Sequence, residues 1–163
     1  MTIIPGGLAH FEASIWACVI DPRHLLDEAN PPALIASWIV HEATHARLWR
    51  CGIGYQEEEL RARVEAVCFR REQAFAAKLP NGEQVREQAD QRLTAYADQG
   101  YWTDEAFRAR YLEGAGKAFQ YLGAPNWLIR VLMAVGPPLV GLTSRTKRYF
   151  GRLLQRTLPP LGN

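Results

Sequence analysis

Residues 31–50, PPALIASWIVHEATHARLWR, decide the fold of this chain. Asn30 precedes two prolines, which is typical of a helix start, because Asn can cap free backbone N–H groups and Pro31 suits the first helical position. Gly52 and Gly54 follow the last arginine and predict the end of the helix. Apolar side chains flank the polar centre on both sides, so we expect this long helix to pack inside a mainly α-helical domain.

A small β element is predicted before this helix. Residues 8–20, LAHFEASIWACVI, alternate with a period of two and indicate one strand or a hairpin, which Asp21 and Pro22 end. A second long helix is predicted at residues 56–79. The predicted fold class is therefore mainly α, with an α+β character. The second helix carries one apolar stripe, formed by Leu60, Val64, Val67, Arg71 and Phe75.

Two more helices are predicted at residues 84–97 and 104–121, with Thr103 as N-cap and Gly123 as stop for the latter. The chain has 163 residues, of which 48% are hydrophobic, so it can bury one sizeable core. We therefore expect one domain at residues 1–126, on which a helical segment at 127–163 packs.

The segment 127–163 differs from the rest in charge. Residues 127–142 are almost uncharged, and residues 143–156 read as a basic amphipathic helix. This pattern is compatible with peripheral contact to a membrane, although the uncharged run is shorter than the roughly 20 residues of a transmembrane helix. The segment contains no acid and six basic residues, which are Arg130, Arg145, Lys147, Arg148, Arg152 and Arg156.

Composition also bears on partners and location. The formal net charge of +2 is too small to imply a nucleic-acid partner. Three widely spaced cysteines argue for a reducing compartment, and the N-terminus lacks the pattern of a secretory signal, so a cytoplasmic protein is expected. Arginines of the second helix alternate with glutamates and are expected on a solvated surface; they are Arg61, Arg63, Arg70 and Arg71.

The polar centre of the first long helix carries the chemistry. His41 and His45 are four residues apart, so they project from one helical face and can hold one metal ion. Glu42 lies about 100° around the axis from His41 and can act on a water molecule at that ion. Burying these groups without a partner would cost several kcal/mol, which favours a zinc site over an ordinary pair of hydrogen-bonded core histidines.

A catalytic zinc ion needs a third protein ligand. The short connection at residues 52–55 makes the second helix an antiparallel neighbour of the first. Glu65 then lies about 14 Å along the second helix, nearly level with His41 at about 15 Å from the end of the first. Cys68, one turn further, is a competing soft ligand, whereas Glu72 is too far along to reach the ion but can serve nearby groups.

The motif His41-Glu42-Ala43-Thr44-His45, followed by Glu65 twenty residues after the second histidine, resembles the gluzincin type of zinc metallopeptidase. The resemblance covers about residues 31–79. It implies a zincin-like fold, a Zn²⁺ ion held by His41, His45 and Glu65, and Glu42 as the general base. It also implies that the strand at residues 8–20 binds the backbone of a peptide or protein substrate.

This chain departs from the family in two ways. We expect no larger second domain within these 163 residues, which suggests a minimal version or one that works with a partner, and no motif selects the residue that stabilises the oxyanion. The acceptor for the outer ring N–H of each histidine also stays open between Asp21, Asp27, Glu72 and a backbone carbonyl. Candidates for the oxyanion role are Tyr55, Tyr96, Tyr101 and His10.

The resulting expectation is hydrolysis of peptide bonds, in which Glu42 takes a proton from water and returns it to the leaving amine. The competing expectation belongs to another class of protein. It is a non-catalytic helical binding module with a structural or vestigial metal site, which docks on a membrane or partner through residues 127–163.

Overall fold

The computed structural model describes residues 8–54 and 57–134 of the chain. It is mainly helical, with one antiparallel hairpin ahead of a long helix, which confirms the predicted fold class. Two compact units divide the chain, Met1–Ala118 and Phe119–Asn163. The elements are β1 (Ala9–Glu12), β2 (Ala17–Ile20), α1 (Pro22–Leu25), α2 (Pro32–Arg50), α3 (Glu58–Ala76), α4 (Glu83–Ala95), η1 (Gln99–Trp102) and α5 (Asp104–Tyr121).

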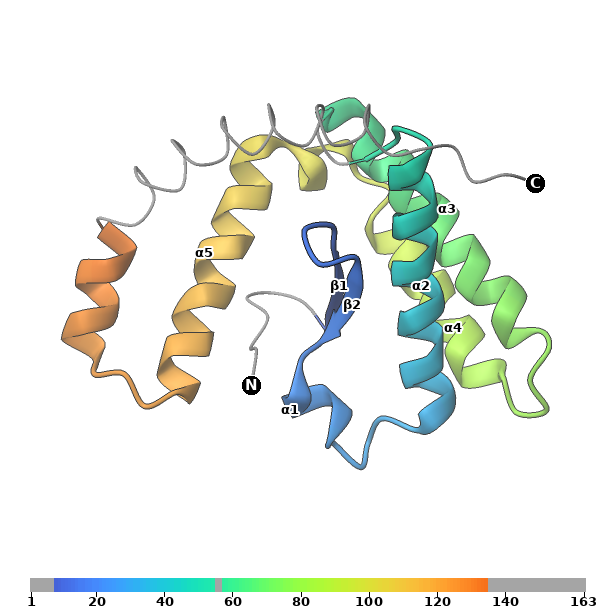
Figure 1. Ribbon diagram of the computed structural model, residues 1–163, viewed down its shortest axis with the longest axis horizontal. Coiled ribbons are helices and arrows are strands. Elements are labelled where there is room, and N and C mark those ends of the chain that lie inside the picture. Colours follow the sequence, from blue (N-terminus) through green and yellow to red (C-terminus); the bar gives the residue numbers. More distant parts are fainter. Residues whose placement is uncertain (1–7, 55–56, 135–163) are drawn as a thin grey trace. The chain divides into compact units, whose positions relative to one another are not determined.

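The hairpin is the small β element expected before α2. Its register pairs Ala9 with Ile20 and Glu12 with Ala17, so a four-residue loop joins the strands. Trp16 ends this loop with a positive φ of 54° and packs its ring edge-to-face against the ring of Phe11. Both strands pack against α2, as Figure 1 shows. The hairpin therefore places backbone N–H groups beside the helix that carries the histidines.

Helix α2 starts one residue later than predicted. Pro31 is the N-cap, Pro32 is the first helical residue, and no side chain caps the helix. The side-chain amide of Asn30 instead donates to the carbonyl of His24 at 2.9 Å, so it supports the end of α1. Gly52 has a φ of +77° and ends α2 as predicted, because this left-handed conformation favours glycine.

Helices α3 and α4 complete the layer on α2. Helix α3 lies alongside α2, and α4 lies alongside α3 (Figure 1). At the turn between α3 and α4, a Cβ on Gly82 would lie 1.9 Å from the carbonyl oxygen of Ala76, so only glycine fits. One buried cluster joins α2, α3 and α4, and its members are Leu34, Trp38, Ala76 and Val85.

Arg61 departs from the surface role predicted for it. It is buried, and its guanidinium donates to the carbonyl of Trp102 at 2.7 Å and to Asp104 at 2.5 Å. The prediction was wrong because the two acceptors lie some forty residues further along the chain, where local charge alternation cannot reveal them. Arg61 thus fixes η1 and the start of α5 on α3.

Helix α5 begins and ends where the sequence predicts. The hydroxyl of Thr103 accepts from the N–H of Ala106 at 3.2 Å, and Gly123 has a φ of +77°. Residues 126–134 are helical, and the rest of the predicted segment 127–163 lies outside the described residues. Within the part of the chain that the structure describes, no helix has the length and apolarity to cross a membrane. The predicted domain boundary at residue 127 stays a prediction.

Candidate metal centre

Two helices contribute the side chains of the predicted zinc site. His41 and His45 come from α2, and Glu65, Cys68 and Glu72 come from α3. All five are buried or nearly so, and the two histidines have only 10–11% of their side-chain surface accessible. The helix pairing predicted from the short connection therefore brings the expected ligand types together.

The side chains of three residues bring two ring nitrogens and the two oxygens of one carboxylate close together. The Nε2 atoms of His41 and His45 are 3.0 Å apart. The carboxylate of Glu65 lies 3.3 Å from His41 Nε2 through one oxygen and 3.2 Å from His45 Nε2 through the other. Donor atoms held about 2.0–2.1 Å from a tetrahedral zinc ion lie about 3.3–3.4 Å from one another. The nitrogen–oxygen separations of 3.2–3.3 Å are close to this value, and the nitrogen–nitrogen separation of 3.0 Å is somewhat shorter.

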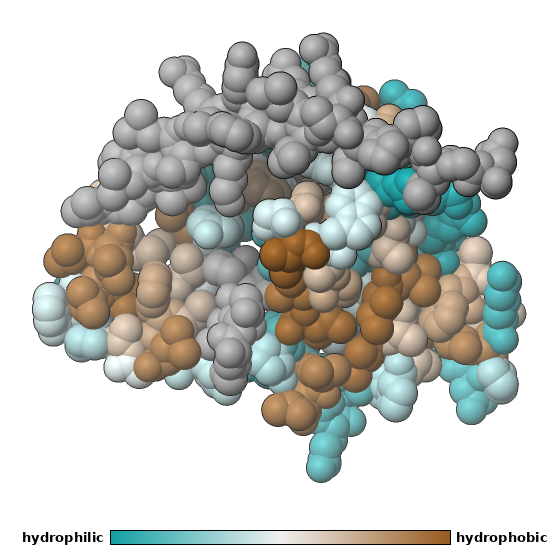
Figure 2. Space-filling view, in the orientation of Figure 1, coloured by the Kyte–Doolittle hydropathy of each residue, from teal (hydrophilic) through white to brown (hydrophobic). Residues whose placement is uncertain are grey.

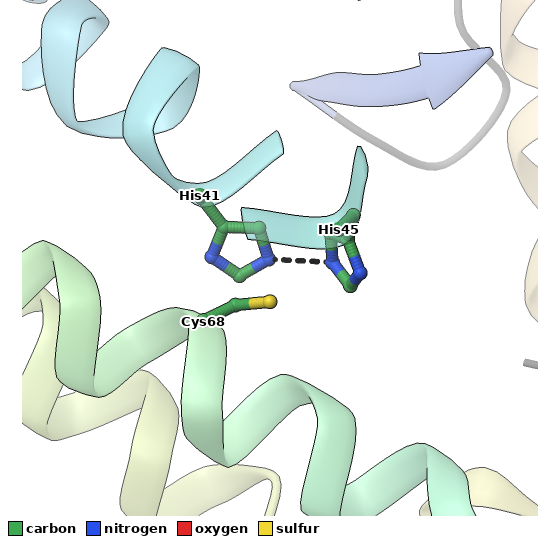
Figure 3. Close-up of side chains that lie close together, drawn as sticks. All are labelled: His41, His45 and Cys68. Carbon is green, nitrogen blue, oxygen red and sulfur yellow. Dashed lines mark hydrogen bonds between the residues drawn. The ribbon is translucent and has the colours of Figure 1, made fainter. Parts of the chain in front are cut away.

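Cys68 is the alternative third donor. Its sulfur points toward the two imidazoles in Figure 3, and one donor atom each from His41, His45 and Cys68 lies within 4.8 Å of the others. These three residues can hold a metal ion such as zinc. Burial first, and then the charges of Glu65 and Glu42, raise the pKa of the Cys68 thiol far above its usual range. Only a bound cation would reverse this preference for the neutral thiol.

Glu72 lies directly behind His41. One of its carboxylate oxygens is 2.6 Å from His41 Nδ1, and the side chain is 1% exposed. Among the acceptors that the sequence left open, Glu72 is therefore the partner of His41. Asp21 is engaged elsewhere, since it caps α1 and pairs with Arg23 at 2.6 Å. Asp27 accepts from the backbone N–H of Ala29.

The charges of the cluster are strongly coupled. Burial lowers the pKa of His41, but hydrogen bonds to Glu65 and Glu72 outweigh it and raise that pKa to about 10. Burial likewise raises the pKa of Glu65, but the hydrogen bonds from His41 and His45 outweigh it and lower that pKa to about 2. In the absence of a metal, the positive charge of His41 compensates the carboxylates around it.

Glu42 faces both the cluster and the hairpin. It is buried, and burial raises its pKa, while the nearby charges of His45 and His41 act in the opposite direction. The backbone N–H of Phe11 in β1 donates a hydrogen bond to this carboxylate and favours its charged form. The predicted general base is thus held between the first strand and the histidines.

The ring contacts near the cluster do not select one residue for the oxyanion role. The ring of Phe69 lies 4.8 Å from that of His41, Tyr96 lies 5.6 Å from Phe69, and Tyr101 stacks on Tyr96 at 4.7 Å. His10 is on the hairpin, with its ring 3.8 Å from the carboxylate of Glu12. Tyr55 lies outside the described residues.

Phe69 is a site residue that the sequence reasoning missed. It follows Glu65 by four positions and so lies on the same helical face, which was the available signal.

Searches of protein-family models, of curated proteins and of solved structures return no match to this chain. The resemblance to gluzincins therefore rests on the sequence motif, and the structure adds a buried group of His41, His45 and Cys68 that could hold a metal ion.

Proposed function

We propose that the chain is a zinc-dependent metallopeptidase of the gluzincin type, with His41, His45 and Glu65 as zinc ligands and Glu42 as the general base. The observation that carries this proposal is the meeting of the three side chains: the two Nε2 atoms are 3.0 Å apart, and each lies 3.2–3.3 Å from one oxygen of the Glu65 carboxylate. These separations are close to those between the ligands of one tetrahedral zinc ion, and the two helices that hold the side chains are long and packed together.

The surrounding residues support the same chemistry. Glu72 accepts a hydrogen bond from His41 Nδ1–H, so the Nε2 lone pair would be free to bind a metal ion. Glu65 contributes a negative charge that offsets part of the charge of a divalent cation. Zinc, when bound, acidifies a water molecule and polarises the carbonyl of a substrate. Glu42 would take one proton from that water as the water oxygen bonds to the carbonyl carbon, and would deliver it to the amine that leaves when the peptide C–N bond breaks.

The ligand set is tested by elemental analysis of the purified full chain. We expect about one zinc ion per chain in the wild type and sharp loss in His45→Ala and Glu65→Ala. Cys68→Ala should retain zinc, because its thiol is not required. The opposite pattern, with zinc lost in Cys68→Ala and kept in Glu65→Ala, would replace Glu65 by Cys68 and remove the basis for a gluzincin site.

Catalysis is tested separately with a mixture of fluorogenic peptides. The wild type should cleave at least one of them, and Glu42→Gln should retain zinc but lose cleavage, because an amide cannot take the proton. Cleavage that survives in Glu42→Gln would contradict the assigned role. Circular dichroism of each variant serves as the folding control.

A second candidate function is supported by the surface of residues 119–134. Leu122, Trp127 and Val131 are exposed apolar side chains there, and the chain from residue 127 onward has six basic residues and no acid. This combination suits a binding module that contacts an anionic membrane. Co-sedimentation with phosphatidylserine vesicles tests it. Equal binding by wild type and by Trp127→Ser/Val131→Ser would contradict the membrane role of this surface.

A further inference from the structure

A groove opens on the side of α3 that faces the end of α4. It has a volume of about 290 Å³. Ala62 and Ala66 lie one turn apart on α3 and leave room because their side chains are small. Leu93 and Tyr96 line the groove from the other side, so most of its wall is apolar. An apolar groove with a few polar groups at its edge is typical of a ligand site.

The groove adjoins the candidate metal centre. Glu65 lines it and also contacts both histidines at 3.2–3.3 Å. Phe69 lines it as well, and its ring lies 4.8 Å from the ring of His41. A side chain held in the groove would therefore lie beside Glu65, which is one of the proposed zinc ligands.

Two arginines border the groove, Arg63 and Arg70. They are seven residues apart, so their Cα atoms lie about 10 Å apart along the same side of the helix. Both are exposed, and within residues 8–54 and 57–134 neither makes a hydrogen bond or ion pair. Arg61 on the same helix differs, since it is buried and paired with Asp104. The groove thus combines an apolar wall with two guanidinium groups that are available to an anionic ligand.

We infer that this groove is a substrate subsite that selects peptides with an acidic side chain next to an apolar one. The apolar side chain occupies the space over Ala62 and Ala66, and the carboxylate pairs with Arg63 or Arg70. Guanidinium groups suit this role because they bind carboxylates in a bidentate manner and stay charged at every physiological pH. The inference rests on the proposed peptidase function and names its substrate class.

Binding is tested with zinc-loaded full-length Glu42→Gln, which removes turnover. The probes are two labelled hexapeptides of sequence Ala-Ala-Leu-Glu-Ala-Ala and Ala-Ala-Leu-Lys-Ala-Ala, followed by fluorescence anisotropy. We expect the acidic peptide to bind about tenfold more tightly, as one new charge-assisted pair would give. Adding Arg63→Glu/Arg70→Glu should abolish or reverse this preference.

The matched control is Arg71→Glu/Arg86→Glu, which makes the same change of charge at exposed positions outside the groove lining. It should keep the preference. Equal loss in both double variants would overturn the inference, because net charge alone would then explain it. Competition by inorganic triphosphate as strong as that by the acidic peptide would overturn it too, since the groove would then be a general anion site.

Cleavage by the wild-type enzyme separates the two proposals. Cleavage of both peptides at equal kcat/KM would overturn the subsite and keep the peptidase. Preferential binding of the acidic peptide by a zinc-loaded chain that cleaves nothing would overturn the peptidase. The groove would then be a site that binds acidic peptides without cleaving them.

Discussion

Helices α2 and α3 bury charged side chains, whereas residues 119–134 expose apolar ones. Glu72 between the two helices is 1% exposed, and Trp127 in the later region is 67% exposed. Figure 2 shows brown, apolar side chains on the visible face of the described chain. Leu122, Trp127 and Val131 are more than half exposed. Both regions depart from the usual pattern of apolar interior and polar surface. In the first region, buried charges of opposite sign compensate one another. In the second region, apolar side chains are left in contact with solvent.

The largest expected effect comes from breaking the buried cluster. Glu72→Ala removes the partner of His41 Nδ1, one of the two carboxylates that contact this buried ring, so we expect the metal-free protein to lose about 3 kcal/mol of unfolding free energy. Urea denaturation measures it. Glu113→Ala is the control, because its pair with Lys117 is solvent-exposed and should contribute nothing measurable. Equal stability of the two variants would contradict the assigned importance of the cluster.

Zinc should stabilise the first region next. A ligand that binds only the folded state adds about 2.7 kcal/mol at a free concentration one hundred times its Kd, so a clear rise in Tm is expected. Differential scanning fluorimetry with and without zinc measures this rise. It should vanish in Glu65→Ala and persist in Cys68→Ala. A rise that is unchanged in both would show that zinc binds elsewhere.

The stability of the metal-free protein should depend on pH through the buried cluster. The pKa of His41 is raised from 6.5 to about 10, so its contribution to stability is complete below pH 6.5 and is lost as pH rises toward 10. The pKa of Glu65 is lowered to about 2, so its contribution is lost as pH falls from 4.5 toward 2. Metal-free protein should therefore be most stable between these limits. His41→Gln should remove the alkaline loss in denaturation curves, and an unchanged curve would contradict the assignment.

The smallest effect is expected in the second region. Trp127→Ser/Val131→Ser should change the free energy of unfolding by less than about 0.5 kcal/mol, because both side chains are already exposed. Urea denaturation of the full chain checks this, alongside the vesicle assay. A loss of several kcal/mol would mean that these side chains are covered in solution, and the contrast between the two regions would disappear.

Much of the helix pairing could be predicted from the sequence. The end of α2 at Gly52 and the short connection that follows place Glu65 level with His41, and the measured 3.3 Å contact confirms this placement. The prediction succeeded because helical rise is constant and a short connection leaves little freedom. The hairpin was also within reach, since its alternating pattern is local.

The buried face of α3 could not be predicted in the same way. Apolar periodicity favoured Val67, which is 38% exposed, and Arg71, which is exposed. The face that α3 buries instead mixes apolar residues with three charged ones, which are Arg61, Glu65 and Glu72. A hydrophobic stripe cannot reveal such a face, because each polar residue is buried only by virtue of a distant partner. The groove beside it depends further on how α4 docks.

The hydrogen bond from the backbone N–H of Phe11 to Glu42 makes the exchange of this amide hydrogen depend on the carboxylate. An amide held by a buried carboxylate exchanges its hydrogen with solvent only when the strand lifts away or the carboxylate lets it go. The exchange rate of this single amide should thus follow the state of Glu42 without any substrate or product being measured. The NMR resonance of the Phe11 amide would therefore show when the Glu42 carboxylate is released from the strand.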